Sequence, residues 1–516
     1  MILTFITPTP ADISAFGVRA LSAYLRRLGH EVRVIFLPGG IEMLRHGGGF
    51  QYQYPKDVLE QIAAIADGSD IIGLSFMSQY RDRAIQITAH LRKSTHARIV
   101  WGGIHTEVNP ADALDHADGV CVGEGERVLP RVIEALGAGR EPSGIPGYWV
   151  RRDGRIVDTG CPELIGDLDE LPLVDMGPDG HYFLEPISGH VLPMTTEALA
   201  RILPLMPAVG GGAITVYRTM TSRGCPHRCT YCANRIMADR HRNEPYLRFR
   251  SPGHVMEELR AVTAAFPFIR AVHFFDDVFT AMPDNALREL CERYAAEIGL
   301  PFYAQASPKT LTREQLTLML DCGLVFLEMG LQTGSPRIQA MYQRAETIAE
   351  ILDGTRLIHA HTPPLLTPHY HVILDNPWES RDDVRATLDL LTRIPGRFKL
   401  CLASLTFYPG TDLHDRAKAE GLLADDDAEI YRKPFFIPKG RYLNYLIYLT
   451  DIAWIPRHWL RWLGGRPAEW FDRPCWGGVF DLARRVTDRL RLIGKGIEAL
   501  GRGEFHRIGR YFRRVR

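Results

Sequence analysis

Residues 221–234, TSRGCPHRCTYCAN, place Cys225, Cys229 and Cys232 in a C-x₃-C-x₂-C array. Closely spaced cysteines are typical metal ligands, but a structural zinc site is closed by four protein ligands. The other cysteines are scattered along the chain, and His227 stands between two cysteines of the array, where it is badly placed to complete one tetrahedron. A [4Fe–4S] cluster held by three thiolates instead leaves one iron open to an external ligand. The array therefore favours an iron–sulfur cluster over zinc.

The composition is that of an ordinary globular protein. The 516 residues include 61 Lys or Arg and 61 Asp or Glu, so no net charge directs the chain to nucleic acid or to a membrane. Nine cysteines without a regular framework fit a reducing cytosol. The amino terminus has no signal-peptide pattern, and no apolar stretch reaches the roughly 18 residues of a membrane span. We expect a cytoplasmic protein of two or three domains.

Helical and strand patterns alternate through the first third of the chain. Apolar residues of segment 18–28 recur at helical spacing, and Gly29 ends this helix before the strand EVRVIFL. Further strand patterns, separated by helical ones, lie at 70–78, 98–103 and 119–125. This alternation predicts a parallel, doubly wound, Rossmann-like (flavodoxin-like) sheet over residues 1–140.

Three expected strand ends of this sheet carry small or polar residues. Ligands of doubly wound sheets bind beyond the carboxyl ends of the strands, and glycine lets a ligand approach the backbone closely. The residues are Ser75, Ser78, Gly102, Gly103, Gly123 and Glu124. They are candidate ligand-binding positions, although tight turns favour the same residue types.

A second series of alternating strand and helix patterns occupies residues 214–425. Its six strand patterns begin near Ala213, Ala271, Pro301, Leu324, His369 and Lys399. The helix SPGHVMEELRAVTAAF has a clear start, because Ser251 can cap it and Pro252 suits the first helical position. Strands separated by helices again predict parallel pairing.

The cysteine array, with Tyr231 directly before its last cysteine, resembles the signature of the radical SAM superfamily. In that superfamily the amine and carboxylate of S-adenosylmethionine (SAM) chelate the open iron. The resemblance implies that the three cysteines are the protein ligands of the cluster. It also implies that residues 214–425 form a partial (β/α)₆ TIM barrel, whose strand ends carry the chemistry.

Other positions match the family pattern and imply contacts to SAM. Asp276 and Asp277 follow the second strand, and Ser307 follows the third. GLQTGS stands where the family usually reads G-I-E-S-G-S, so Gln332 replaces a glutamate. ILDNPWES aligns with I-x-G-x-P-x-E-[ST], where Asp375 replaces a glycine. The resemblance implies that SAM is bound by Tyr231, Asp276, Asp277, Ser307 and Gln332.

The first third resembles the cobalamin-binding domain found ahead of many radical SAM enzymes, on the stretches GLS and VWGGIHTEVNPADALDHADGVCVGEGE. The resemblance implies that the six strand-end residues named above bind cobalamin. The D-x-H-x-x-G motif that supplies a histidine to cobalt is absent from the sequence. This implies either cobalt without a protein histidine or a degenerate domain that has lost the cofactor. Within residues 141–213, the stretches GIPGYWVRRDGRIVDTG and IGDLDELPLVD resemble the small hairpin and the linker that join the two domains. The stretch from about 176 to 213 resembles no known segment, and it is either a substrate-side insertion or a longer linker.

As a whole the chain resembles cobalamin-dependent, class B radical SAM methyltransferases. The resemblance implies methylation of an unactivated carbon of a small-molecule, lipid or natural-product intermediate, through a 5′-deoxyadenosyl radical and methylcobalamin. It also implies an electron donor such as flavodoxin or ferredoxin, and no nucleic-acid partner. Two alternatives stay open: a cyclase or rearrangement enzyme with the same cofactors, and a non-catalytic cobalamin or cluster sensor. The sequence identifies no catalytic residue.

Residues 426–516 lack the alternation and are expected to form a helical, basic extension. FDLARRVTDRLRLIGKGIEAL repeats apolar residues at helical spacing and predicts an amphipathic helix. This helix could attach the protein to anionic lipid, or it could cap the barrel and expose a basic face, which is the interpretation we prefer.

A histidine-rich stretch, HAHTPPLLTPHYHVILD, precedes the fifth barrel strand and enters it. His369 and His371 alternate onto one face of that strand. They predict a polar, substrate-facing lining of the barrel, with a metal site as the alternative.

Overall fold

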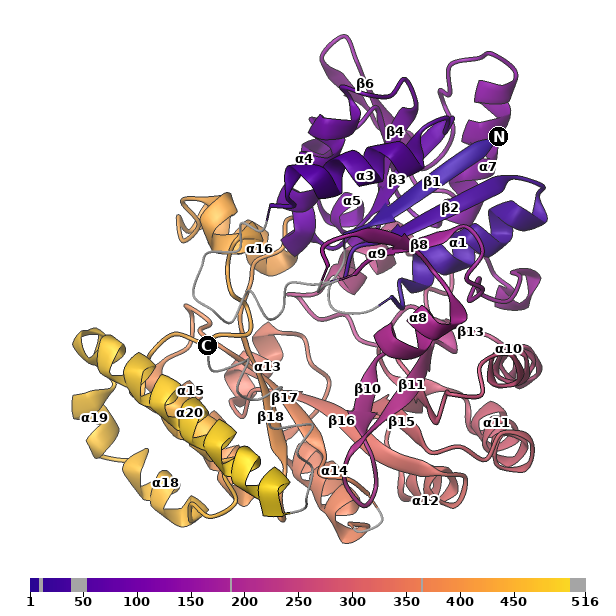
Figure 1. Ribbon diagram of the computed structural model, residues 1–516. Coiled ribbons are helices and arrows are strands. Elements are labelled where there is room, and N and C mark those ends of the chain that lie inside the picture. Colours follow the sequence, from indigo (N-terminus) through magenta and orange to yellow (C-terminus); the bar gives the residue numbers. More distant parts are fainter. Residues whose placement is uncertain (9–12, 39–52, 186–187, 363–364, 502–516) are drawn as a thin grey trace.

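The computed structural model describes residues 1–8, 13–38, 53–185, 188–362 and 365–501. Two sheets with their covering helices lie next to each other, and a helical extension lies at the outer side of the second (Figure 1). Within these ranges, no helix is long and apolar enough to cross a membrane. Both predicted α/β units and the predicted helical extension are confirmed.

The first sheet is doubly wound. Its central strands are β1 (Ile2–Thr7), β2 (Glu31–Phe36), β3 (Ile71–Ser75), β4 (Arg98–Gly102) and β5 (Gly119–Cys121), all parallel. The helices around them are α1 (Phe16–Arg27), α3 (Lys56–Ala66), α4 (Arg81–Leu91), α5 (Ile104–Val108), α6 (Pro110–Ala113) and α7 (Gly125–Gly137). Because helices cover both faces, the strands are apolar runs, and β1 is buried from its second residue to its last.

The order of these strands, β5-β4-β3-β1-β2, is the predicted flavodoxin-like order. From β1 the chain first adds β2 on one side and then β3, β4 and β5 on the other, so the strand order reverses between β1 and β3. In such sheets the crevice for a ligand lies at this reversal, outside the carboxyl ends of the strands.

Residues 141–213, expected to be a hairpin and a linker, extend the first sheet at both edges. The hairpin of β6 (Tyr148–Arg152) and β7 (Arg155–Val157) pairs with β5, while β8 (His181–Leu184) and β9 (Val191–Pro193) continue from β2. α8 (Thr196–Ile202) then leads to the second sheet. Unpaired strand edges expose rows of N–H and C=O groups, and the added strands cover them. Much of the segment is therefore integrated into the sheet.

The second sheet holds six parallel strands in sequence order, as a partial (β/α)₆ barrel requires. They are β11 (Ala213–Thr219), β14 (Ala271–Phe274), β15 (Phe302–Ala306), β16 (Leu324–Gln332), β17 (His369–Leu374) and β18 (Lys399–Ser404). β10 (Leu205–Pro207) pairs antiparallel with β11 at one edge. The helices between them are α10 (Pro252–Ala265), α11 (Asp284–Glu297), α12 (Arg313–Asp321), α13 (Pro336–Met341), α14 (Ile348–Ala360) and α15 (Arg381–Arg393).

Side-chain caps mark several of these helix starts. Ser251 accepts a hydrogen bond from the third residue of α10, as the sequence predicts. Thr347 and Ser380 form reciprocal capping boxes at α14 and α15. These caps set the points where the chain turns from each strand end into the next helix.

After β18 the chain forms α16 (Asp412–Ala419) and a helical extension. The extension consists of α17 (Tyr442–Leu449), α18 (Arg457–Leu463), α19 (Pro467–Phe471) and α20 (Gly477–Gly501). α17 packs on α15, and the other three helices contact α17. Hydrogen bonds join Tyr445 to Thr487 (2.9 Å) and Tyr448 to Asp488 (2.6 Å), which hold one face of α20 against α17. The predicted helix is confirmed, and the basic segment 502–516 lies outside the described residues.

Candidate active site

A cavity of about 780 Å³ lies between the carboxyl ends of the two sheets. The first sheet contributes the ends of β1, β3, β4 and β5, where its strand order reverses. The second contributes the cysteine loop and the segment after β14. The cavity thus brings together the predicted residues Ser75, Gly102, Gly103, Gly123, Glu124, Cys232 and Asp277. Its volume is in the range of ligand sites, about 300–1,000 Å³.

The three cysteines of the array lie in one loop between β12 (Ser222–Arg223) and α9 (Ala233–Arg240). Cys229 is buried, whereas Cys225 and Cys232 are half-buried. Three thiols on one short loop are the donor set that the sequence predicts for a cluster.

Burial sets the protonation of two of the thiols. Burial raises the pKa of Cys225 to about 12 and that of Cys232 to about 11, so both stay neutral unless a metal centre stabilises the thiolate. A guanidinium nitrogen of Arg344 lies 3.7 Å from Cys229 Sγ.

His227 is not available as a fourth ligand, because its ring is engaged in the barrel. Its Nε2 lies 3.0 Å from Ser307 Oγ and 3.6 Å from Glu346 Oε1. Among the described residues, no three His, Cys, Asp or Glu side chains gather closely enough to hold a single metal ion. A four-iron cluster is larger than one ion and accepts ligands that stand further apart. The donor set therefore fits a three-thiolate cluster better than zinc.

The two aspartates after β14 have different surroundings. Asp276 is fully buried and accepts hydrogen bonds from the Thr221 N–H (2.9 Å) and from the Ser222 hydroxyl (2.5 Å). It therefore anchors the start of the cysteine loop. Asp277 lines the cavity and accepts a hydrogen bond from Asn234 Nδ2 (2.9 Å). Burial raises the pKa of Asp277, and a cationic group beside it would restore the ionised form.

Three other predicted SAM contacts lie outside the cavity. The Tyr231 ring packs edge-on against Tyr342, with ring centroids 4.9 Å apart. The buried Ser307 hydroxyl donates to Glu346 Oε1 (2.8 Å). Gln332 ends β16 in a left-handed conformation, with φ 64°. Their contact with SAM stays a prediction that the shape of the cavity does not by itself support.

Asp375, the residue that stands where the family pattern has glycine, also has a positive φ, 63°. Glycine adopts this conformation without steric penalty, and aspartate is among the few other residues that tolerate it. The Asp375 carboxylate accepts hydrogen bonds from the Lys439 N–H and from Asn444 Nδ2, both at 2.8 Å. These contacts stabilise the strained turn and attach the helical extension to the end of β17.

Two glycines at strand ends of the first sheet expose their main chain to the cavity. Gly103 has φ 87° and ψ −170°, and a Cβ there would lie 2.8 Å from the Phe76 nitrogen and 2.9 Å from Ser75 Oγ. Gly123 has φ 93°, and a Cβ there would lie 2.8 Å from Pro162 Cδ. Only glycine satisfies both constraints, so close packing against Phe76 and Pro162 requires glycine at these two positions of the cavity wall.

Replacing Gly103 by alanine is expected to destabilise the first domain and weaken cobalamin binding. The added methyl group would clash with the Phe76 backbone. In addition, the φ and ψ angles of Gly103 are essentially restricted to glycine, so we expect the variant to lose about 3 kcal/mol of stability. Gly139 is the matched control, because it has φ 66° but nothing within 4 Å, so its alanine variant should lose only about 1 kcal/mol. Denaturant unfolding and cobalamin titration by absorbance measure both effects. Equal losses in the two variants would contradict the close approach at Gly103.

Ser78, another predicted cobalamin contact, does not reach the cavity. It is buried, and its hydroxyl lies 3.3 Å from His105 Nδ1. The Nε2 of His105 in turn lies 3.0 Å from Asp112 Oδ2, which also pairs with Arg81. Ser78 thus belongs to a polar network behind the sheet end.

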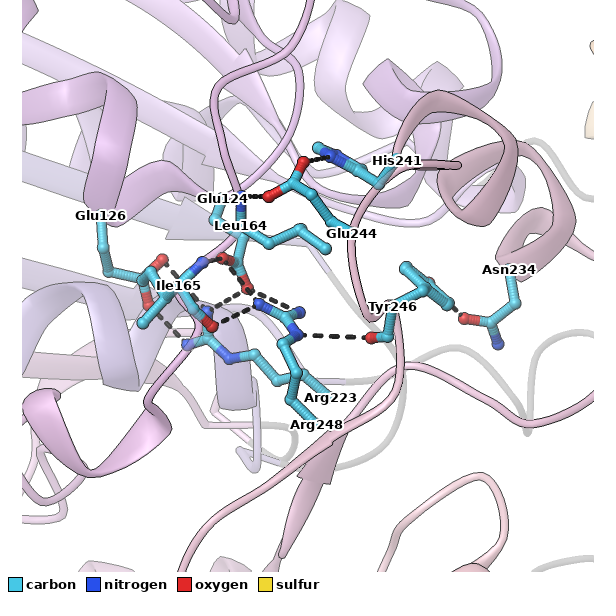
Figure 2. Close-up of polar contacts among 10 residues, drawn as sticks. All are labelled: Glu124, Glu126, Leu164, Ile165, Arg223, Asn234, His241, Glu244, Tyr246 and Arg248. Atoms are coloured by element: carbon cyan, nitrogen blue, oxygen red, sulfur yellow. Dashed lines mark hydrogen bonds and ion pairs between the residues drawn. The ribbon is translucent and has the colours of Figure 1, made fainter.

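Glu124 lines the cavity, but its carboxylate joins an ion-pair cluster between the two domains (Figure 2). Arg223 donates to Glu124 (2.8 Å) and to Glu126 (2.6 Å), and Arg248 donates to Glu124 (3.1 Å). The Ile165 N–H also donates to Glu124 (2.6 Å). We call Glu124, Glu126, Arg223 and Arg248 the interdomain ion cluster.

The interdomain ion cluster joins the two walls of the cavity. Although burial alone would raise it, Arg223 and Arg248 hold the pKa of Glu124 below its ordinary value. Arg223 lies two residues before Cys225, whereas Glu124 lies three residues after the end of β5 and directly precedes α7. Sequence analysis missed both arginines, because nothing local shows that they pair with glutamates about a hundred residues away. The only local signal was a pair of glutamates at a strand end.

The two histidines of β17 face one carboxylate on β16. Glu328 lies 3.1 Å from His371 Nε2 and 3.6 Å from His369 Nδ1. Despite its burial, these histidines hold the pKa of Glu328 far below its ordinary value. The three side chains form one polar cluster across β16 and β17, and their place in a substrate-facing lining of the barrel stays a prediction.

Fold and site together define a class of protein: an enzyme in which a Rossmann-like domain and a partial barrel with a cysteine loop share one cavity. Comparison with protein families gives the same division. The B12 binding domain family matches residues 3–133, and the radical SAM superfamily matches residues 219–391. The chain is therefore a radical SAM enzyme with an amino-terminal B12-binding domain, and its cofactors are a [4Fe–4S] cluster, SAM and cobalamin.

Individual relatives agree with this assignment. The uncharacterized methyltransferase PH0819 of Pyrococcus horikoshii is 25% identical over 360 residues, which are 69% of this chain and 70% of that protein. The radical SAM methyltransferase TsrM of Kitasatospora setae has a similar structure, with a TM-score of 0.61, 18% identity and coverage of 81% of this chain and 78% of that one. The cobalamin-dependent radical enzyme OxsB, with aqua-cobalamin and SAM bound, gives a TM-score of 0.56 at 17% identity over 82% and 55% of the two chains. At these identities the structures show a common fold, and the chain is related to methyltransferases.

Proposed function

We propose that this enzyme methylates an unactivated carbon of a small-molecule, lipid or natural-product intermediate. The observation that carries the proposal is the common cavity, which has the B12-domain strand ends on one side and the cysteine loop on the other. An sp³ carbon is not nucleophilic, so a polar methyl transfer to it would fail. Radical activation and methyl delivery must therefore act on one carbon held between two cofactor sites.

We assign Cys225, Cys229 and Cys232 as the cluster ligands. When bound, the cluster with SAM supplies the one-electron chemistry that activates a C–H bond, and cobalamin supplies the transferable methyl group. The electron comes from a donor such as flavodoxin or ferredoxin. Arg344 donates to Cys229 Sγ and so helps to orient this ligand.

The remaining residues that we assign bind SAM or cobalamin, or they orient the cysteine loop. We assign Asp277 as the partner of the SAM ammonium, because it is an acidic group on the cavity wall beside the cysteine loop. Asp276 is a positioning residue that holds Thr221 and Ser222 at the start of that loop. Gly102, Gly103 and Gly123 let the corrin approach the backbone of the first sheet.

We also propose four functional segments. Residues 1–140 form the cobalamin-binding domain, 141–213 connect the two domains, 214–425 form the radical SAM barrel and 426–516 form the helical, basic extension. The two sheets and the helices of the extension support this division. Within 141–213, two pairs of strands attach the connection to the first sheet at both of its edges.

Product stoichiometry tests methyl transfer. Reduced, cluster- and cobalamin-loaded protein is incubated anaerobically with SAM carrying a deuterated methyl group and with an extract of small molecules and lipids. We expect S-adenosylhomocysteine and 5′-deoxyadenosine in equal amounts, because one SAM gives its methyl group and a second is cleaved. Mass spectrometry should find a product carrying the labelled methyl group.

The same assay separates the alternatives. 5′-Deoxyadenosine without S-adenosylhomocysteine would assign the chain to cyclisation or rearrangement chemistry. No cleavage of SAM by the reduced, loaded protein would favour a sensor.

A further inference from the structure

The helical extension exposes several large aromatic side chains. Trp454, Trp459, Trp462 and Trp470 are 81%, 61%, 71% and 68% exposed. They lie on α18, on α19 and in the turn before α18, at the outer edge of the molecule (Figure 1). Large apolar side chains gathered on one surface mark a site of interaction with a protein or a membrane.

α20 adds an exposed apolar stripe. Its members are between 47% and 62% exposed, and they are spaced by three or four residues, so they share one face of the helix: Val479, Leu482, Val486, Leu490 and Ile493. Another face of α20 packs on α17 through Phe480, which contacts the rings of Tyr442 and Tyr445. The exposed stripe is therefore additional to the face that attaches the helix to the barrel.

Positive charge surrounds these apolar side chains. Arg485 and Arg489 are exposed on α20 and, at helical spacing, lie beside the stripe. Arg466 and Arg473 are exposed among the tryptophans, next to the exposed Glu469. Arg461 is exposed there too and pairs with Asp389 (2.5 Å). In sequence, residues 502–516 continue this pattern with six arginines and a single glutamate.

We propose that the exposed face of α18, α19 and α20 docks on the surface of an anionic lipid bilayer. Tryptophan is enriched where protein meets the boundary between headgroups and acyl chains, because its ring is apolar and its N–H is polar. A helix with an apolar stripe and basic flanks lies in the plane of that boundary, and arginines are attracted to anionic headgroups. A protein partner is less suitable, since the exposed groups spread over three helices and a turn. We call this face the lipid-docking face; its role is independent of methyl transfer.

Vesicle co-sedimentation of the purified full-length protein tests the proposal. We expect the protein to sediment with vesicles of phosphatidylglycerol and phosphatidylcholine in equal parts, and much less with phosphatidylcholine alone. Binding should weaken as salt is added, because the headgroup attraction is screened. Tryptophan emission should shift to shorter wavelength on binding.

Two pairs of substitutions probe the apolar contacts: Trp459→Ser with Trp462→Ser, and Leu482→Gln with Leu490→Gln. Each pair is expected to weaken binding to anionic vesicles at least about tenfold, because two exposed apolar groups can no longer enter the bilayer boundary. All four side chains are exposed, so thermal unfolding should be unchanged. The matched control is Leu192→Gln on β9, which removes a 40% exposed leucine outside the lipid-docking face and should bind as the wild type does.

A third double variant, Arg485→Glu with Arg489→Glu, reverses two of the positive charges. It should bind anionic vesicles more weakly, and its binding should depend less on salt. Failure of the wild type to sediment with anionic vesicles would overturn the proposal, as would equal binding by all variants. A stable dimer in sedimentation velocity that Leu482→Gln with Leu490→Gln dissociates, without vesicle binding by the wild type, would assign the face to a second copy of the chain instead.

Discussion

Replacing Cys229 by alanine is expected to remove the iron–sulfur cluster and, with it, all reductive cleavage of SAM. Cys229 is the most buried of the three cysteines and lies 3.7 Å from the Arg344 guanidinium. With two cysteines left in the loop, the cluster loses one of the three ligands that the loop supplies. The loss of SAM cleavage should exceed the roughly 10–100-fold effects typical of changes outside the first ligand shell.

Iron analysis, the visible spectrum and 5′-deoxyadenosine formation measure this result after anaerobic reconstitution. Cys475→Ala is the matched control, because Cys475 is exposed in the helical extension, and it should reconstitute as the wild type does. Cys291→Ala extends the control to a buried cysteine in α11. A Cys229→Ala protein that retained its iron and cleaved SAM would refute the assignment of the cluster ligands.

Replacing Arg223 by methionine is expected to lower the free energy of unfolding by about 3 kcal/mol, because it leaves buried carboxylates without their partner. The Glu126 side chain is 5% exposed and has its ion pair with Arg223, while Glu124 would keep Arg248 and the Ile165 N–H. The contact between the two walls of the cavity should weaken as well. Cobalamin affinity should therefore fall, although the three cysteines remain in place. Denaturant unfolding and cobalamin titration measure the two effects.

A double-mutant cycle separates the ion pair from other losses. Arg223→Met with Glu126→Gln should recover part of the stability, giving a coupling energy of about 1–3 kcal/mol. Arg242→Met is the matched control, because Arg242 is 71% exposed in its pair with Asp239 and should contribute less than about 1 kcal/mol. If the stability losses of the two single variants simply add in the double variant, Arg223 and Glu126 do not stabilise the protein through their ion pair.

The effect of Arg223→Met also has a defined pH dependence. The arginines hold the pKa of Glu124 below its ordinary value of about 4.3, so their stabilisation is complete at neutral pH and is lost as the pH falls through the folded-state pKa. The stability difference between wild type and variant should therefore begin to shrink as the pH falls below about 4, and it should shrink further as Glu124 becomes protonated in the folded wild type as well.

The spacing of apolar residues in the sequence predicted most of the fold. Apolar runs separated by amphipathic helices predicted both parallel sheets, since a strand covered on both faces must be apolar throughout. The segment 141–213 was harder, because its short edge strands form only by pairing with β2 and β5 and have weak patterns of their own. Of the candidate site, the glycines at strand ends were found correctly as cavity residues, since a bare backbone is a property of the residue itself.

The sequence by itself determined the two α/β units, the cysteine loop and the bare strand ends, because spacing and residue type encode them locally. Only the tertiary structure decided that Asp276 holds the loop while Asp277 faces the cavity, that Ser78 turns toward His105, and that Glu124 pairs with Arg223. The physical reason is that the direction of a side chain at a strand end depends on what packs against it. Those neighbours come from segments far away in the chain, which no local pattern can identify.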